Sequence, residues 1–131
     1  MAWTRARFID GDPAGNRIPD AVDRVGSLGI SWQLPRGWSL GGRLRHLGPA
    51  ALTEDNAVRS APSTLVNFDL GYRFGRGWKA SLALLNAFDA KANDITYFYE
   101  SRLPGETSAV PDVHFHPVEP RQWRVSVAAT F

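Results

Sequence analysis

Hydrophobic and polar residues alternate along most of this chain with a period of two, as in a β-strand whose two faces meet different surroundings. In residues 121–131, for example, Trp123, Val125 and Val127 share one face, whereas Gln122 and Arg124 share the other. This pattern predicts six strands, at about 2–8, 25–34, 38–47, 64–74, 78–88 and 121–131. The first is the least regular. In the fifth, the phase is lost at Leu85-Asn86, which indicates a β-bulge.

Two kinds of connection join these segments. Tight turns at 35–37 and 75–77 each lead directly into a tryptophan, whereas 9–23, 48–63 and 89–120 are long and polar. A compact soluble domain rarely has three such loops. In an antiparallel meander, short and long connections fall at opposite ends. We therefore expect the tight turns and the C-terminus on one side, the periplasmic side of a barrel, and the long loops on the other.

Strand length and face composition favour a membrane barrel. Most predicted strands have close to ten residues, about the 9–11 that cross a bilayer, whereas soluble strands average about 5–6. The polar faces are rich in Gly, Ser, Asn and Gln, with Arg and Asp at mid-strand, which is typical of a water-filled lumen.

Aromatic residues form two bands. Those at the tight-turn end are Trp32, Trp38, Tyr72, Phe74, Trp78 and Phe131, and those at the long-loop end are Phe8, Phe88 and Trp123. Such bands mark the two interfaces of a bilayer. The predicted fold is all-β: an antiparallel six-stranded up-and-down meander, an open curved piece of a transmembrane β-barrel whose two edge strands do not pair with each other.

Composition narrows the function. The 131 residues suffice for one domain, and the absence of cysteine excludes a disulfide scaffold, a thiolate metal site and a catalytic thiol. The 15 basic and 13 acidic residues are interspersed, which does not predict a nucleic-acid interface. No serine nucleophile has a convincing base and acid around it, and no carboxylate pair is set up for acid–base work, so we expect no enzyme.

Asp112, His114 and His116 are the only cluster with ligand chemistry. In an extended segment the two histidines point the same way, and they could hold a metal. The alternative, which we favour, is that they are loop residues beside Phe115 and Pro117. No metal or cofactor is predicted.

Two further sets of residues are candidates for ligand or lumen contacts. The predicted lumen-facing residues are Arg43, Arg45, Asn67, Asp69, Arg73 and Arg124, and Arg5 and Arg7 belong mostly to the same polar face. One interpretation is that these arginines line a lumen, where they hold a plug or let an anionic substrate pass. The other, which we favour, is that they pair across strands with Asp69 and neighbouring carboxyl groups. In the longest loop, Tyr97, Phe98, Tyr99 and Arg102, together with His114 and His116, either contact a ligand at the cell surface or extend a hairpin above the membrane.

The segment at 84–89, Leu-Leu-Asn-Ala-Phe-Asp, resembles the Asn-x-Phe-Asp element on the penultimate strand of TonB-dependent outer-membrane receptors. The alternating last strand, which ends in Phe131, resembles the signal that directs barrels to outer-membrane assembly. Asn-Arg-Ile-Pro at 16–19 and Ser-Thr-Leu-Val-Asn at 63–67 add to the resemblance. The chain departs from the assembly signal at Ala129, where an aromatic residue is usual, and at Ser126, where a glycine is usual.

The resemblance implies that residues 1–131 are about the last six strands of a barrel of about 22, without its plug domain. It implies TonB-dependent uptake of a ferric siderophore, cobalamin or a similar nutrient across the outer membrane of a Gram-negative bacterium. The implied partners are outer-membrane lipid, TonB through the missing N-terminal parts, the barrel assembly machinery through the C-terminal strand, and an unidentified small ligand.

Two alternatives come from other classes. One is a stand-alone soluble β-sheet binding module. The other is a propeller piece, because the two tight turns are forty residues apart. A propeller blade, however, needs four strands per repeat, and only two fit here.

Overall fold

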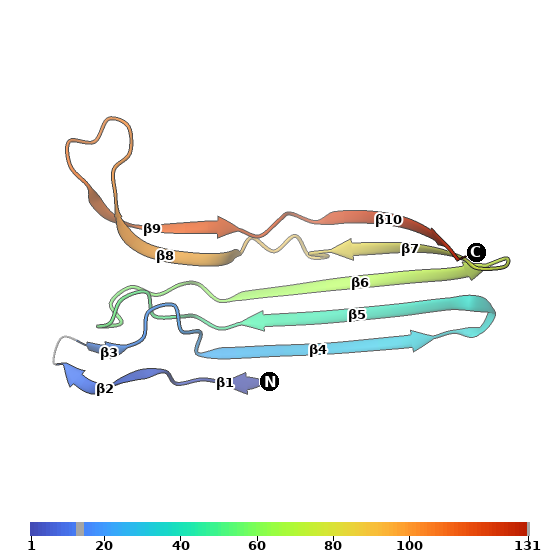
Figure 1. Ribbon diagram of the computed structural model, residues 1–131, viewed down its shortest axis with the longest axis horizontal. Helices are drawn as coiled ribbons and strands as arrows, with labels where there is room; N and C mark the ends of the chain where they lie inside the picture. The colour runs from blue at the N-terminus through green and yellow to red at the C-terminus, as the bar shows by residue number, and fades with distance from the viewer. Residues whose placement is uncertain (13–14, 131) are drawn as a thin grey trace. The chain divides into compact units, whose positions relative to one another are not determined.

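The protein is described by a computed structural model, which covers the backbone of residues 1–12 and 15–130 and the side chains outside 10–14 (Figure 1). It is an all-β chain. Its main sheet is antiparallel, with the strand order β1-β4-β5-β6-β7-β10. These strands are β1 (Ala2–Trp3), β4 (Arg24–Gln33), β5 (Trp38–Leu47), β6 (Ser63–Phe74), β7 (Trp78–Leu85) and β10 (Gln122–Ala129). The sheet is open, as predicted, because no other described strand pairs with the outer edges of β1 and β10.

Two smaller sheets occupy the long connections. β2 (Arg7–Asp12) pairs with β3 (Gly15–Arg17), and β8 (Asn93–Ser101) pairs with β9 (Val110–Pro117). The longest connection is therefore a hairpin rather than a plain loop, as one of the two interpretations of Tyr97 to Arg102 expected. A single 3₁₀ turn, η1 (Pro35–Gly37), forms the first tight turn. No described helix is long and apolar enough to cross a membrane.

The strand predictions were confirmed in the middle of the chain and wrong at its start. β5 has the predicted bounds, and β4 and β6 begin one residue early. The predicted strand at 2–8 is wrong, because β1 pairs with β4 only at Ala2↔Val25 and Trp3↔Arg24. Before Arg24 the chain instead bridges to the 48–63 connection at Val22↔Ala50, so contact with the β4 segment ends after the Thr4 N–H bond to Asp23 O. A separate strand, β2, therefore begins at Arg7, and Arg5 and Arg7 do not share a strand.

The break in phase predicted in the fifth strand lies directly after β7. The pairing of β7 with β6 and with β10 runs without a shift as far as Leu84 and Leu85. The Ala87 N–H then donates to Val66 O at 2.8 Å, whereas the β6–β7 register would place Leu65 opposite Ala87, so one extra residue is inserted here. Asn86, the first residue after β7, is in the left-handed conformation with φ 46°. Asparagine tolerates this region better than most residues do. The loss of phase at Leu85-Asn86 therefore marks the end of the strand.

The chain forms two compact units. One comprises residues 1–25, 47–63 and 92–118, and the other comprises residues 26–46, 64–91 and 119–131. We call them the loop unit and the wall unit. Most of the main sheet lies in the wall unit, and the two small sheets lie in the loop unit.

Cross-strand rows in the wall unit confirm the period-two pattern. Residues directly opposite each other in an antiparallel pair share a face of the sheet. The apolar rows across β6, β7 and β10 are Phe68–Leu84–Trp123, Leu70–Leu82–Val125, Tyr72–Ala80–Val127 and Phe74–Trp78–Ala129. The rows between them are Asp69–Ala83–Arg124, Gly71–Ser81–Ser126 and Arg73–Lys79–Ala128. One face is thus apolar on all three strands, and the other carries the polar and charged side chains.

Both tight turns and the end of β10 gather at one edge of the wall unit. The amide of Thr130 donates to the carbonyl of Gly77 at 2.9 Å, and Leu34 N–H donates to Trp38 O across the first turn at 2.9 Å. The rings of Trp38 and Tyr72 lie 4.4 Å apart, which brings the first turn beside the end of β6. This part of the predicted topology is confirmed. Phe131 lies outside the described residues.

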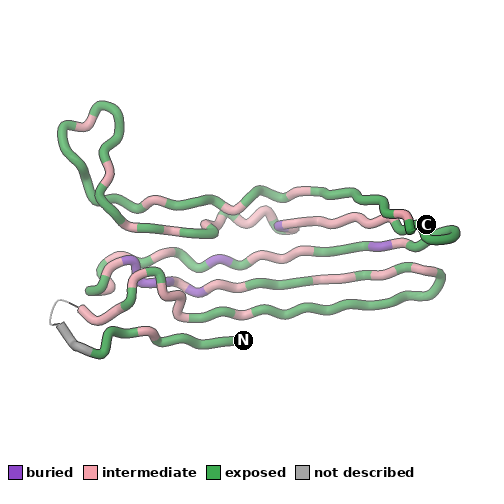
Figure 2. The backbone as a smooth tube through the Cα atoms, viewed as in Figure 1, coloured by how far each residue is buried: buried purple, intermediate pink, exposed green. Residues whose placement is uncertain are grey.

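Burial is sparse. The buried apolar residues are Ala50, Ala51 and Leu52, all in the loop unit. Large side chains on the strands are exposed, including Leu28 at 72% and Val125 at 73% (Figure 2). Continuous apolar exposure of this kind marks a surface that meets a partner or a membrane.

Gly77→Ala tests the join between the second tight turn and β10. Gly77 has φ +86°, and an added Cβ would lie 2.3 Å from the carbonyl oxygen of Thr130. The left-handed conformation alone costs a non-glycine residue about 1–2 kcal/mol, and the backbone clash adds to that. We expect a clear loss of folded, heat-modifiable barrel on unheated gels.

The matched control is Gly105→Ala. Gly105 has φ +101°, but nothing lies within 4 Å of an added Cβ. This variant bears the conformational cost without the clash. If the two variants lose the same amount of folded protein, Thr130 does not dock on the turn.

Candidate functional site

The wall unit has a band of aromatic side chains on its apolar face. Ring centroids are 4.4 Å apart for Trp38 and Tyr72, 6.0 Å for Tyr72 and Phe74, and 6.3 Å for Phe74 and Trp78. The four residues come from the ends of β5, β6 and β7 at the tight turns. This arrangement confirms the grouping of these four aromatics, which was predicted from their positions along the strands.

The opposite face holds a shallow depression of about 410 Å³. Its polar lining side chains are Ser31, Gln33, Ser39, Arg43, Asp69 and Lys79. The Asp69 side chain lies against Gly41 of β5, and Arg73 Nη2 donates to Gln33 Oε1 at 3.4 Å. Arg73 thus reaches an amide on β4 rather than a carboxylate. The face presents both charge signs and small residues, which suits contact with water or polar molecules.

The predicted lumen-facing residues divide between this depression and its surroundings. Arg43 and Asp69 line it, and Arg124 lies on the same face as Asp69, with Ala83 between them. Arg45 lies two residues after Arg43 on β5. Asn67 has a different task, because its side-chain oxygen accepts the backbone N–H of Asn86 at 2.9 Å. That these residues face a lumen stays a prediction.

Asn86 is the most constrained polar side chain of the wall unit. It is 4% exposed, and its amide makes three hydrogen bonds. Nδ2 donates to the carbonyls of Ala90 at 3.1 Å and Glu119 at 3.0 Å, and Oδ1 accepts from Ala90 N–H at 2.8 Å. Asn86 therefore ties the exit of β7 to the entry of β10, across the whole 92–118 excursion.

Asp89 completes this junction. Its Oδ1 accepts from Arg121 N–H at 3.0 Å, and its Oδ2 pairs with Lys91 Nζ at 2.9 Å. The Arg121 hydrogen bond and the Lys91 ammonium group hold the pKa of the Asp89 carboxyl below its ordinary value of 3.8. The stabilisation is therefore present at neutral pH, and it is lost only as the pH falls through that lowered pKa.

The sequence analysis used Asn86 and Asp89 only for the family resemblance and did not predict that they hold this junction together. An Asn and an Asp three residues apart, directly after a strand, were the available signal.

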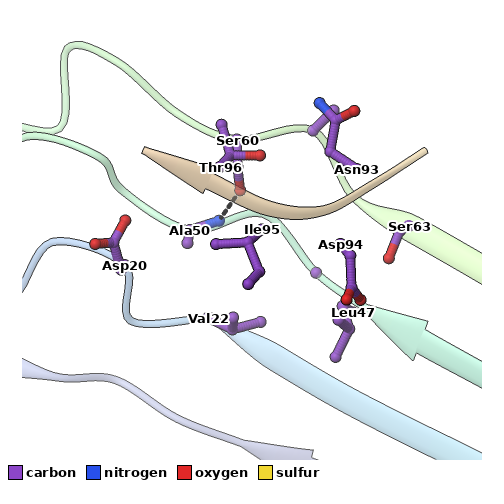
Figure 3. Close-up of a pocket in the computed structure, with 12 residues that line it drawn as sticks. Asp20, Val22, Leu47, Ala50, Ser60, Ser63, Asn93, Asp94, Ile95 and Thr96 are labelled. Atoms are coloured by element: carbon purple, nitrogen blue, oxygen red, sulfur yellow. Dashed lines mark hydrogen bonds between the residues drawn. The ribbon is translucent and has the colours of Figure 1, made fainter. Parts of the chain in front are cut away.

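The loop unit contains a small cavity of about 110 Å³ (Figure 3). It is lined by Asp20 and Val22, by the 47–63 connection, and by residues 93–96 of β8. Ser60 Oγ accepts the amide of Ala50 at 2.9 Å beside it. Backbone bonds join the first two long connections, with Arg17 N–H donating to Glu54 O at 3.1 Å and Asp20 N–H to Ala51 O at 2.8 Å. All three long connections thus meet in one unit, as the predicted topology required.

An ion-pair cluster links the same two connections. Asp23 accepts a close hydrogen bond from Arg59, and Arg17 Nη1 lies 3.8 Å from Asp23 Oδ1. The sequence did not predict this cluster, because Asp23 and Arg59 are 36 residues apart along the chain.

The β8–β9 hairpin brings most of the candidate ligand contacts onto one face. Tyr97 is opposite His114, Tyr99 is opposite Asp112, and Ile95 is opposite His116. The rings of Tyr99 and His114 stack at a centroid distance of 4.0 Å, and His114 Nε2 is enclosed without a hydrogen-bond partner. Arg102 lies apart from this face, at the hairpin tip, where its Nε donates to Glu106 O at 2.9 Å. Across the described part of the chain, no three His, Cys, Asp or Glu side chains come together to hold a metal ion.

Asn86→Ala tests the junction between β7 and β10. The substitution removes three part-buried hydrogen bonds and leaves their backbone groups without the Asn86 amide, at about 1 kcal/mol for each. We expect the free energy of unfolding to fall by about 3 kcal/mol, measured as an earlier denaturant midpoint for loss of the heat-modifiable band.

Asn56→Ala is the control, because Asn56 has a similar backbone conformation, with φ 61°, but its side chain accepts one exposed bond from Arg59. We expect a loss of less than about 1 kcal/mol. Equal losses for Asn56 and Asn86 would show that only the left-handed backbone matters.

One comparison with known proteins gives a match. A family model described as "TonB dependent receptor-like, beta-barrel" matches residues 1–87 of the 131. The match spans β1 to β7 and ends inside the turn that Asn86 begins, so β10 and the β8–β9 hairpin lie beyond it. The chain has no match among curated proteins.

Proposed function

The chain belongs to the family of TonB-dependent outer-membrane receptor barrels, and we propose that it forms wall strands and surface loops of a receptor for a ferric siderophore, cobalamin or a similar nutrient. Members of this family are transporters rather than enzymes, and they lie in the outer membrane. Family membership leaves open the ligand, the direction of each face, the completion of the barrel and the side of the loops.

The two-faced sheet of the wall unit carries the proposal. Four apolar rows across β6, β7 and β10 contact lipid, and the face of Asp69, Ser126 and Arg124 lines the aqueous lumen. A soluble module would leave Val125 and Val127, at 73% and 61% exposure, in water. In lipid, the same exposure is favourable, because hydrocarbon replaces water around these side chains.

Strands from outside residues 1–131 complete the barrel. An unpaired backbone group in hydrocarbon costs several kcal/mol, so an open edge cannot face lipid. Both β1 and β10 present such an edge. A coding sequence for further strands and a plug domain upstream of residue 1 would support this step.

The long connections meet the cell exterior and the tight turns meet the periplasm, as in other barrels of this kind. The hairpin face of Tyr97, Tyr99, His114 and His116 then meets the ligand from outside. TonB acts through parts of the receptor outside these residues, and the barrel assembly machinery binds the β10 edge. Aromatic stacking and an enclosed imidazole suit a planar or aromatic ligand group.

A pair of arginine substitutions in β10 tests the direction of the faces. Val127 is opposite Ala80 on the apolar face, and Ser126 is opposite Ser81 on the polar face. An arginine on the lipid side near the midplane costs about 2–4 kcal/mol, whereas a lumen-facing one keeps its water. In the receptor that carries this segment, Val127→Arg should sharply reduce the folded, heat-modifiable barrel in outer-membrane fractions, and Ser126→Arg should not.

The two substitutions add the same side chain to neighbouring residues of one strand, so each controls for the other. Equal losses, or a greater loss from Ser126→Arg, would mean that the faces are assigned the wrong way round or that the sheet does not meet lipid.

A further inference from the structure

A second concave site in the loop unit is lined mainly by arginine. Its lining residues are Trp3, Thr4, Arg5, Arg17, Asp23 and Arg24, which surround about 440 Å³. We call it the arginine site. It is distinct from the cavity of Figure 3, with which it shares no lining residue.

The arginine site is positively charged, because three arginines and one carboxylate, that of Asp23, line it. Asp23 is already engaged by Arg59 and Arg17. Arg5 and Arg24 are exposed, and neither forms an ion pair with a described carboxylate. Arg7 adds to the excess, because it lies directly opposite Arg17 in the β2–β3 ladder. Like charges directly opposite each other destabilise a strand pair, and a bound anion relieves that repulsion.

The site lies where the apolar face of β4 ends. Arg24, the first residue of β4, is opposite Trp3 on the same face. Strand alternation gives Arg24 the parity of Leu28, Ile30 and Trp32, which are all exposed. Trp3 is 76% exposed. Along this strand the apolar side chains thus give way to a tryptophan and arginines, the residues that proteins place at the headgroup level of a bilayer.

We propose that the arginine site binds the phosphate group of a lipid headgroup on the outer surface of the barrel. Arg5 and Arg24 supply guanidinium forks that match phosphate oxygens. Trp3 lies at the boundary between headgroup and acyl chain. Arg17 and Arg59 hold Asp23 and so position the site. That this site faces the membrane rests on the proposed function. A free phosphate ion offers the same oxygens, so the test includes both sources.

The receptor, purified in detergent, is titrated with phosphatidic acid, with phosphatidylcholine and with inorganic phosphate, and bound ligand is counted by native mass spectrometry. We expect phosphatidic acid to bind in preference to phosphatidylcholine, and inorganic phosphate to compete poorly. Arg5→Gln/Arg24→Gln should weaken phosphatidic acid binding about thirtyfold, from the loss of two arginines near an anionic surface. Arg5→Lys/Arg24→Lys keeps the charge and should weaken it less.

The control is Arg76→Gln/Arg102→Gln, which removes the same charge from a tight turn and from the hairpin tip. An equal loss in this control would reduce the effect to net charge and overturn the inference. Displacement of the lipid by equimolar inorganic phosphate would overturn the lipid assignment. If Arg5→Gln/Arg24→Gln does not assemble, Arg5→Lys/Arg24→Lys is the deciding variant. Phosphatidic acid binding equal to that of the unsubstituted receptor would then show that the guanidinium groups are not used. A heat-modifiable band with no lipid preference refutes this inference alone, because the barrel itself has then formed.

Discussion

The continuous pairing of β6, β7 and β10 is the constraint on which the rest of this structure depends. Side chains alternate between the faces at every residue, so a shift of one residue in any strand would move its apolar set to the polar face. The register Leu70–Leu82–Val125 keeps three strands in phase, and Asp69–Ala83–Arg124 follows in the next row. A two-faced wall results, and none of its described apolar side chains is buried.

The junction around Asn86 explains how this register survives a long interruption. Between β7 and β10 the chain leaves the wall unit to form the β8–β9 hairpin, and it then returns. Asn86 binds the backbone on both sides of the excursion, at Ala90 and Glu119, and Asp89 binds the amide of Arg121. The place of β10 on β7 is thus held by contacts at the two ends of the excursion.

The sequence predicted the wall well and the loop unit poorly, for a physical reason. Strands with one apolar face have a strong period-two pattern, and β5 was predicted with its bounds. Residues 2–8 were misassigned because the pairing of β1 with β4 ends at Trp3↔Arg24, which local alternation cannot show. The Asp23–Arg59 pair and the facing of Tyr97 with His114 depend on contacts between distant segments. The hairpin face nevertheless collects four of the six candidate ligand residues, Tyr97, Tyr99, His114 and His116.

Site-directed spin labelling tests the central claim, that one face of the wall meets lipid and the other meets water. Residues 1–131 contain no cysteine, so single cysteines at each residue from 122 to 129 can be labelled without background from this segment. In the reconstituted receptor, labels at Trp123, Val125 and Val127 should be accessible to oxygen, which concentrates in lipid. Labels at Gln122, Arg124 and Ser126 should instead be accessible to a water-soluble nickel complex. Alternation at every residue is the predicted result, and nickel accessibility at all six positions would contradict the account.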